Sequence, residues 1–264
     1  PSSFQGVARR GGGGRGRGPV RKAARRSLLR MASQMPSLVA ASSVAAAALL
    51  VAGMLGPVQG GGLPLGIWFT WHPVLMSLAF PCLMPLGRWV YLADSLPGLG
   101  NAEKPQRRSL HRALMGTAAI LVLVGYVAIF MAHLPGRQFF GYDFKNHTWK
   151  EWRRVVHSLL GYALIGLVLA QGFLGAYKLK ALKADGERKY TFHGDLGKAI
   201  IVLGCLNVLV AVWFWAWGAA MKAATTLAVV ACGVFGALWP RADEPEEGES
   251  QELNKGAAIG APAE

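Results

Sequence analysis

The chain has 264 residues, of which 53% are hydrophobic and only 16% are charged, and its formal net charge is +14. The apolar residues form long blocks without the alternating pattern of β-strands, which excludes a transmembrane β-barrel and predicts an all-α, polytopic membrane protein. The positive charge is concentrated in an Arg/Gly-rich N-terminal segment, a composition that can bind RNA. Because this segment stands beside several long apolar blocks, we expect no nucleic-acid partner.

Residues 1–36 form a basic, Arg/Gly-rich tail, and residues 241–264 form an acidic one. Both segments are poor in aromatic residues and rich in glycine or charge, which is typical of disorder. We interpret the basic tail as a cytosolic segment that faces anionic lipid. The alternative is that residues 1–30 precede the native start, because "MASQMPSLVA" from Met31 resembles a natural beginning.

Between the tails, residues 37–240 are predicted to form one membrane domain of six helices. Each apolar stretch has about the 17–25 residues that a helix needs to cross a bilayer. The first is rich in alanine, and we expect it to serve as an uncleaved signal. The six stretches lie near residues 37–59, 66–91, 109–133, 155–177, 194–217 and 220–240.

Charged loops predict the orientation of these spans. Basic residues concentrate in the N-terminal tail and in the loops after the second and fourth spans, which places these loops and both termini in the cytosol. The sequence Asn146-His147-Thr148, after the third span, is an N-glycosylation sequon and favours the exoplasmic side. The sequence does not distinguish an endomembrane (vesicle, vacuole, lysosome or endoplasmic reticulum) from the plasma membrane.

Four of the six histidines occur one per span, in the second to fifth spans. Because consecutive spans run in opposite directions, His72 and His157 belong near the exoplasmic face, whereas His111 and His193 belong near the cytosolic face. Histidine is rare inside membranes and usually functional there. We therefore predict two histidine pairs, each contributed by diagonal helices of a central four-helix bundle.

Two imidazoles at one level suit the two axial positions of a haem iron. We predict two haem b groups, separated across the bilayer by roughly 15–20 Å at a rise of about 1.5 Å per residue. Zinc is disfavoured, since its sites use three or four protein ligands. Cys82, Cys205 and Cys232 lack metal-ligand spacing, and we interpret them as buried apolar residues.

Basic pairs precede three of the four histidines by about one turn. Their side chains are candidates to neutralise haem propionates or to attract an anionic reductant. The competing interpretation is that they extend towards the lipid headgroups without a ligand role. The pairs are Arg107 and Arg108, Arg153 and Arg154, and Arg188 and Lys189.

The dipeptide His72-Pro73 suggests a local break in the second span. A residue before proline is disfavoured in helical geometry. We therefore expect His72 to lie at a backbone irregularity that a bound cofactor would stabilise.

Several motifs resemble the cytochrome b561 family, in particular its stand-alone cytochrome b561 domain-containing transmembrane reductases. They are "WHPVLMSLAF", "RRSLHRALMG", "VVHSLLGYALIGLVLAQGFLGAY" and "YTFHGDLGKA". The resemblance covers residues 37–240 and implies a di-haem protein that passes electrons across a membrane. It implies cytosolic ascorbate as donor, monodehydroascorbate or a ferric chelate as acceptor, and the four histidines as haem ligands in the same two pairs.

Two alternatives remain open. The chain could be a haem-binding relay subunit of a larger oxidoreductase, or a transporter with a histidine-lined path for protons or metal ions. The region "PLGRWVYLADSL" also differs from the order of the family's ascorbate-associated motif, so the donor is less well specified than the haem ligands. The sequence leaves a homodimer open.

Overall fold

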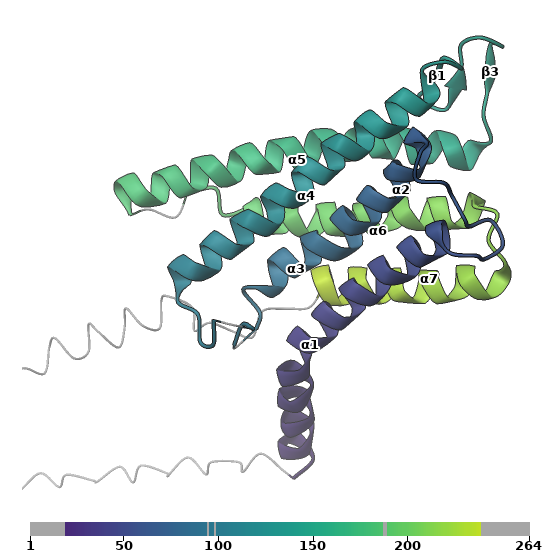
Figure 1. Cartoon of the computed structure of the whole chain (residues 1–264). Coiled ribbons are helices and arrows are strands. Elements are labelled where there is room, and N and C mark those ends of the chain that lie inside the picture. Colours follow the sequence, from purple (N-terminus) through teal and green to yellow (C-terminus); the bar gives the residue numbers. More distant parts are fainter. Residues whose placement is uncertain (1–18, 94, 98, 187–188, 239–264) are drawn as a thin grey trace, which may run out of the picture. The chain divides into compact units, whose positions relative to one another are not determined.

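The computed structural model describes residues 19–93, 95–97, 99–186 and 189–238. Within these residues the elements are seven α-helices and two π-helical turns, with one small sheet between α4 and α5 (Figure 1). They are α1 (Pro19–Leu55), α2 (Trp68–Leu78), η1 (Ala79–Leu83), α3 (Met84–Trp89), α4 (Lys104–His133), β1 (Gln138–Phe139), β2 (Tyr142–Asp143), β3 (Thr148–Trp149), α5 (Trp152–Asp185), α6 (His193–Phe214), α7 (Ala219–Gly233) and η2 (Val234–Leu238).

Six helical stretches in the described part of the chain are long and apolar enough to cross a membrane. The predicted number and order of spans are therefore confirmed. Two helices extend well beyond the predicted stretches: α4 starts at Lys104, and α5 continues to Asp185. Such extensions carry polar residues, whose side chains are hydrated outside the hydrocarbon region.

The chain divides into two compact units, residues 1–34 and 35–264. Within the first unit, residues 19–34 are helical as part of α1. This differs from the disorder expected for residues 1–36, and the cause is local: "RKAARRSLLRMA" consists mostly of strong helix formers. Residues 1–18 and the acidic tail of residues 241–264 lie outside the described residues.

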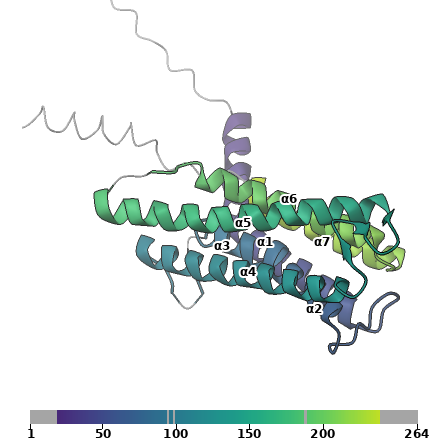
Figure 2. The ribbon, with the colours of Figure 1, turned by 90° about the horizontal axis from the view of Figure 1, so that it is seen from above.

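In the second unit, α2 packs mainly against α4, and α5 packs mainly against α6. Figure 2 shows these two helix pairs on opposite sides, with α6 adjacent to α7. The hydrophobic core contains residues from α1, α4, α5, α6 and α7. The helices α1 and α7 therefore pack against the same core as the helices that carry the histidines. Its fully or almost fully buried members include Leu50, Phe80, Val122, Leu164, Ile201 and Val229.

The second span is irregular, but not at His72. The helix α2 runs without a break from Trp68 through His72 and Pro73. The expected break at His72 is therefore wrong. Pro73 lies near the start of α2, where few backbone hydrogen bonds precede it, and the irregularity is instead the π-helical turn η1, which contains Pro81. A missing proline N–H is compatible with such a turn.

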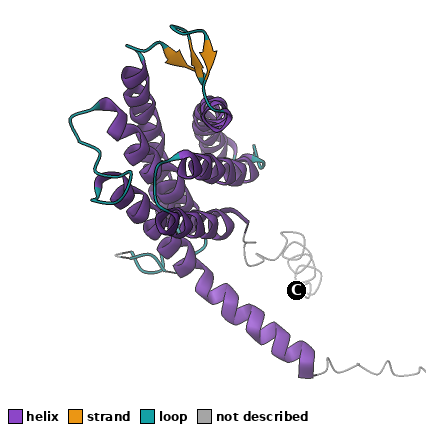
Figure 3. Cartoon of the chain, turned by 90° about the vertical axis from the view of Figure 1, so that its right-hand side faces the viewer, coloured by secondary structure: helices purple, strands orange, loops and turns teal. Residues whose placement is uncertain are grey.

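The loop between α4 and α5 forms a three-stranded antiparallel sheet in the order β1-β2-β3. Figure 3 shows these strands beyond the helix ends. Each strand has only two residues, which is too short to give a periodic sequence signal. For that reason the sheet was not expected from the sequence.

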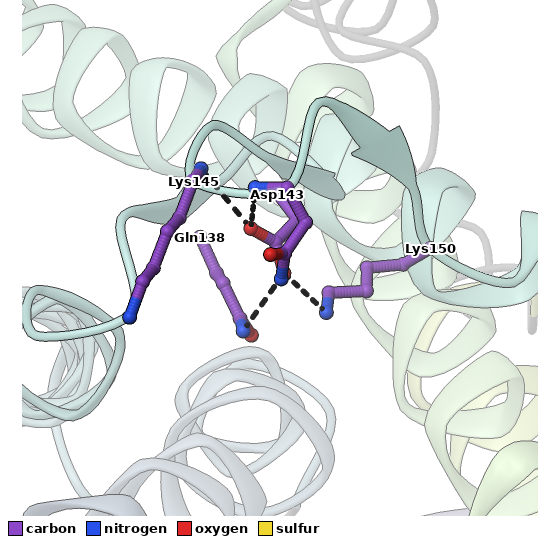
Figure 4. Close-up of polar contacts among 5 residues, drawn as sticks. Gln138, Asp143, Lys145 and Lys150 are labelled. Carbon is purple, nitrogen blue, oxygen red and sulfur yellow. Dashed lines mark hydrogen bonds and ion pairs between the residues drawn. The ribbon is translucent and has the colours of Figure 1, made fainter.

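Asp143 organises this loop (Figure 4). Its carboxylate is almost fully buried and accepts hydrogen bonds from the backbone N–H groups of Lys145 and Asn146 at 3.1 and 3.0 Å. The side chains of Gln138 and Lys150 also donate to it, Lys150 at 3.0 Å. The hydrogen bond from the Asn146 backbone and then that from Lys150 lower the pKa of Asp143 from 3.8 to about 2.

This pKa predicts a pH dependence for the loop. Because the pKa of Asp143 is lower in the folded loop than its ordinary 3.8, its stabilisation is complete above that value and is lost as the pH falls towards about 2. Hydrogen exchange of residues 138–150 should therefore show protection that decreases between about pH 4 and pH 2. Asp143→Asn should lack this protection at neutral pH and this pH dependence. An identical pH profile in the variant would contradict the role of Asp143.

Candidate functional site: two histidine pairs

The four intramembrane histidines lie in two pairs, one near each end of the central helices. His72 of α2 and His157 of α5 have ring centres 6.2 Å apart, with an interplanar angle of 89°. His111 of α4 and His193 of α6 have ring centres 6.4 Å apart, with an angle of 74°. All four side chains are half-buried. Each pair thus combines two histidines from different helices.

The spacing within each pair suits two ligands on opposite sides of one metal ion. A bond from a metal to an imidazole nitrogen is about 2 Å long, and the ring centre lies about 1 Å further out, so opposed rings have centres about 6 Å apart. Both observed distances are close to this value. In the described residues, no group of three or more His, Cys, Asp and Glu residues could hold a metal ion. Each pair itself offers two imidazoles, which fits a haem held by two histidines.

Hydrogen bonds define the tautomer of three of these rings. The Nδ1 atom of His72 lies 3.0 Å from the carbonyl oxygen of Gly125, and that of His111 lies 2.9 Å from the carbonyl oxygen of Gly87. The Nδ1 atom of His157 lies 3.1 Å from the carbonyl oxygen of Asn207.

A carbonyl oxygen can only accept, so Nδ1 carries the proton in each of these three rings. The lone pair of the neutral ring is then on Nε2, the nitrogen that remains available to a metal.

These hydrogen bonds also relate the two levels to each other. Gly125, the partner of His72, lies 14 positions after His111 on α4. Asn207, the partner of His157, lies 14 positions after His193 on α6. At a rise of 1.5 Å per residue, each interval corresponds to about 21 Å along the helix. This is slightly more than the separation expected from the sequence, and helix tilt reduces the component across the bilayer.

His193 has a different environment from the other three. Its Nδ1 atom is buried and has no hydrogen-bond partner. The side chain of Gln171, on α5, donates from Nε2 to the backbone oxygen of His193 at 2.6 Å. The Oε1 atom of the same glutamine is buried without a partner. Sequence reasoning did not identify Gln171, because a single amide in an apolar helix gives no distinct pattern.

Aromatic rings lie beside each pair. Tyr91 lies against His111, with ring centres 5.2 Å apart, and Phe214 lies against His157 at 5.5 Å. The guanidinium group of Arg154 lies over the Phe214 ring at 5.5 Å. Tyr91 lies in the turn after α3 and Phe214 ends α6, so both contacts depend on the tertiary fold and cannot be read from local spacing.

The predicted basic residues have diverse environments. Arg107 donates to three backbone carbonyls, and Arg153 donates to the Trp213 carbonyl and forms an ion pair with Glu151. Arg108 is half-exposed and Lys189 is exposed.

Arg188 lies outside the described residues. Whether any of these six groups contacts a propionate or an electron donor stays a prediction.

Comparison with known proteins gives one family. A family model described as eukaryotic cytochrome b561 matches residues 71–214, which is more than half of the chain and includes all four paired histidines. No solved structure matches significantly.

Two curated relatives match shorter segments. The plasma membrane ascorbate-dependent reductase CYBRD1 of Mus musculus is 35% identical over 68 residues, which are 26% of this chain and 22% of the relative. The lysosomal membrane ascorbate-dependent ferrireductase CYB561A3 of Homo sapiens is 34% identical over 107 residues, 40% of this chain and 38% of the relative. The matched segments thus span less than half of either relative. The extent of the family match is what decides the assignment: the chain belongs to the eukaryotic cytochrome b561 family.

Proposed function

We propose that the protein transfers electrons across a membrane, from cytosolic ascorbate to monodehydroascorbate or a ferric chelate on the other side. The observation that carries this proposal is the presence of two histidine pairs about 21 Å apart along the helices, each with the spacing of opposed axial ligands. The names of the two relatives, an ascorbate-dependent reductase and an ascorbate-dependent ferrireductase, support the same reaction class.

In this proposal His72 and His157 hold one haem b, and His111 and His193 hold the other. A haem held in this way by two imidazoles would supply single-electron transfer. The protein's part is to present unprotonated Nε2 atoms: the carbonyls of Gly125 and Gly87 keep the proton of their histidine on Nδ1.

The polar ends of the helices would serve the donor and the propionates. We assign the His111–His193 end to the cytosol, together with both termini, on the charge of its loops. Arg108 and Lys189 are exposed enough there to attract an anionic reductant. Arg153 and Arg154 lie at the opposite end, close to Trp213 and Phe214, where they would pair with propionates.

An anaerobic titration of the purified protein with ascorbate, followed by visible absorbance, tests this function. We expect about two haems per chain and full reduction without a partner protein. If the haems are present but ascorbate reduces them only when another protein is added, the chain is a relay subunit. A preparation without a low-spin haem spectrum, even after porphyrin supplementation during expression, would overturn the proposal and favour the transporter alternative.

A further inference from the structure

The Nδ1 atoms of the paired histidines differ in one respect. Those of His72, His111 and His157 each meet a backbone carbonyl of a neighbouring helix at 2.9–3.1 Å. The Nδ1 atom of His193 is buried with no partner. A buried polar atom without a hydrogen-bond partner is costly and rare in proteins. The environment of His193 therefore requires an explanation that the other three do not.

An unused acceptor lies on a side chain that already contacts His193. Gln171 donates from Nε2 to the backbone oxygen of His193 at 2.6 Å, while its Oε1 atom is buried and has no partner. The two unsatisfied atoms thus belong to two residues that are hydrogen-bonded to each other. A hydrogen bond from the imidazole N–H to the amide oxygen would satisfy both atoms at once.

The register of the four helices points to the same residue. The acceptor for His72 lies 14 positions after His111, and the acceptor for His157 lies 14 positions after His193. Gly87, the acceptor for His111, lies 15 positions after His72. Gln171 lies 14 positions after His157.

Each of the four spans thus carries a ligand at one level and, about four turns later, a residue that contacts the histidine at the other level. Gln171 occupies the fourth of these positions, and there the side chain makes the contact.

We propose that Gln171 is a positioning residue for His193, whose Nδ1–H it accepts through Oε1 so that Nε2 faces the iron of the cytosolic haem. This inference rests on the proposed function. One turn further along α5, Gly175 leaves room for the ring, because an added Cβ there would lie 3.1 Å from the Cε1 atom of His193. An acceptor on Nδ1–H makes the ligand more basic, which stabilises ferric over ferrous iron. Gln171 therefore lowers the midpoint potential of one haem and not of the other.

The test is a comparison of midpoint potentials by spectroelectrochemistry in wild type, Gln171→Leu and Gln171→Glu, with haem content measured in each. The cytosolic haem is identified as the one that His111→Ala removes. We expect Gln171→Leu to shift the one-electron equilibrium of the cytosolic haem at least threefold towards the ferrous form. This corresponds to a midpoint potential raised by about 30 mV or more. Gln171→Glu, which keeps an acceptor and adds charge, should shift the equilibrium the other way. The second haem should stay unchanged in both variants.

Thr226→Val is the matched control, because it removes another buried oxygen without a partner, on α7. It should alter neither potential. If Gln171→Leu loses the cytosolic haem while Gln171→Glu keeps it, the acceptor role is supported. Two retained haems with unchanged potentials in both Gln171 variants, or loss of the haem in both, would overturn this inference and leave the proposed function intact. A wild-type protein without two haems would instead overturn the proposed function.

Discussion

His111→Ala is expected to remove one haem and to abolish reduction by ascorbate from the cytosolic side, while the other haem stays bound. The substitution leaves His193 as a single imidazole, whose Nδ1 already lacks a backbone acceptor. The His72–His157 pair keeps its own partners, Gly125 and Asn207. Loss of a ligand should exceed the 10–100-fold cost that is typical of losing only an outer partner of a ligand. Haem content per chain and the rate of haem reduction by ascorbate measure the two effects.

The matched control is His147→Ala, because His147 lies in the exposed loop between β2 and β3 and outside both pairs. That variant should keep both haems and the wild-type rate. The reciprocal variant His72→Ala should remove the other haem and leave the cytosolic one reducible. If His111→Ala retains two haems and full reduction, the assignment of the pairs is wrong.

The spacing of the histidines predicts much of this arrangement. Because successive spans alternate in direction, four histidines near the starts of their spans must fall at two levels, and the structure brings His72 to His157 and His111 to His193. The number of spans follows from the length of the apolar blocks alone. These two features depend on chain direction and on length, which a sequence states directly.

Other parts of the site depend on packing between helices that are distant in sequence. The carbonyl of Gly125 becomes the partner of His72 only after α2 and α4 are packed in register. Glycine has no side chain that could mark such a role, and any residue supplies a carbonyl. The effect of Pro73 cannot be read from the sequence for a related reason: the cost of a proline depends on its distance from the helix start, and no capping residue marks the start at Trp68.

Arg107 illustrates the same limit. From sequence, Arg107 and Arg108 are an equivalent basic pair before His111. In the structure, Arg107 donates from Nη1 to the carbonyls of Val90 and Ala93, both at 2.6 Å, and from Nε to that of Ala102 at 2.9 Å. These three acceptors belong to a small buried cluster in and beside the loop between α3 and α4. Arg107 therefore connects this loop to the first turns of α4, the helix that carries His111.

Arg107→Gln should destabilise the protein far more than Arg108→Gln, although both remove one positive charge. Each hydrogen bond from a charged donor contributes about 1.5–3 kcal/mol, and the shorter glutamine amide can replace at most one of the three, so the variant should lose about 3 kcal/mol or more. The loop of residues 90–103 should become sensitive to limited proteolysis, and Tm should fall. Arg108→Gln should change the free energy of unfolding by no more than about 0.5 kcal/mol. Its effect should instead be a KM for ascorbate raised about two- to fivefold, the equivalent of up to about 1 kcal/mol.

The comparison separates a fold-stabilising cation from a donor-attracting one. Thermal unfolding monitored by haem absorbance gives the first quantity, and steady-state reduction over a range of ascorbate concentrations gives the second. Arg107→Lys is the informative third variant, because it keeps the charge but lacks the planar, multi-donor guanidinium group that reaches three carbonyls at once. If Arg107→Lys restores the stability lost in Arg107→Gln, charge and not hydrogen-bond geometry determines the role of this residue. Equal Tm values for Arg107→Gln and Arg108→Gln would contradict a structural role for Arg107 and return it to the group of candidate donor-site cations.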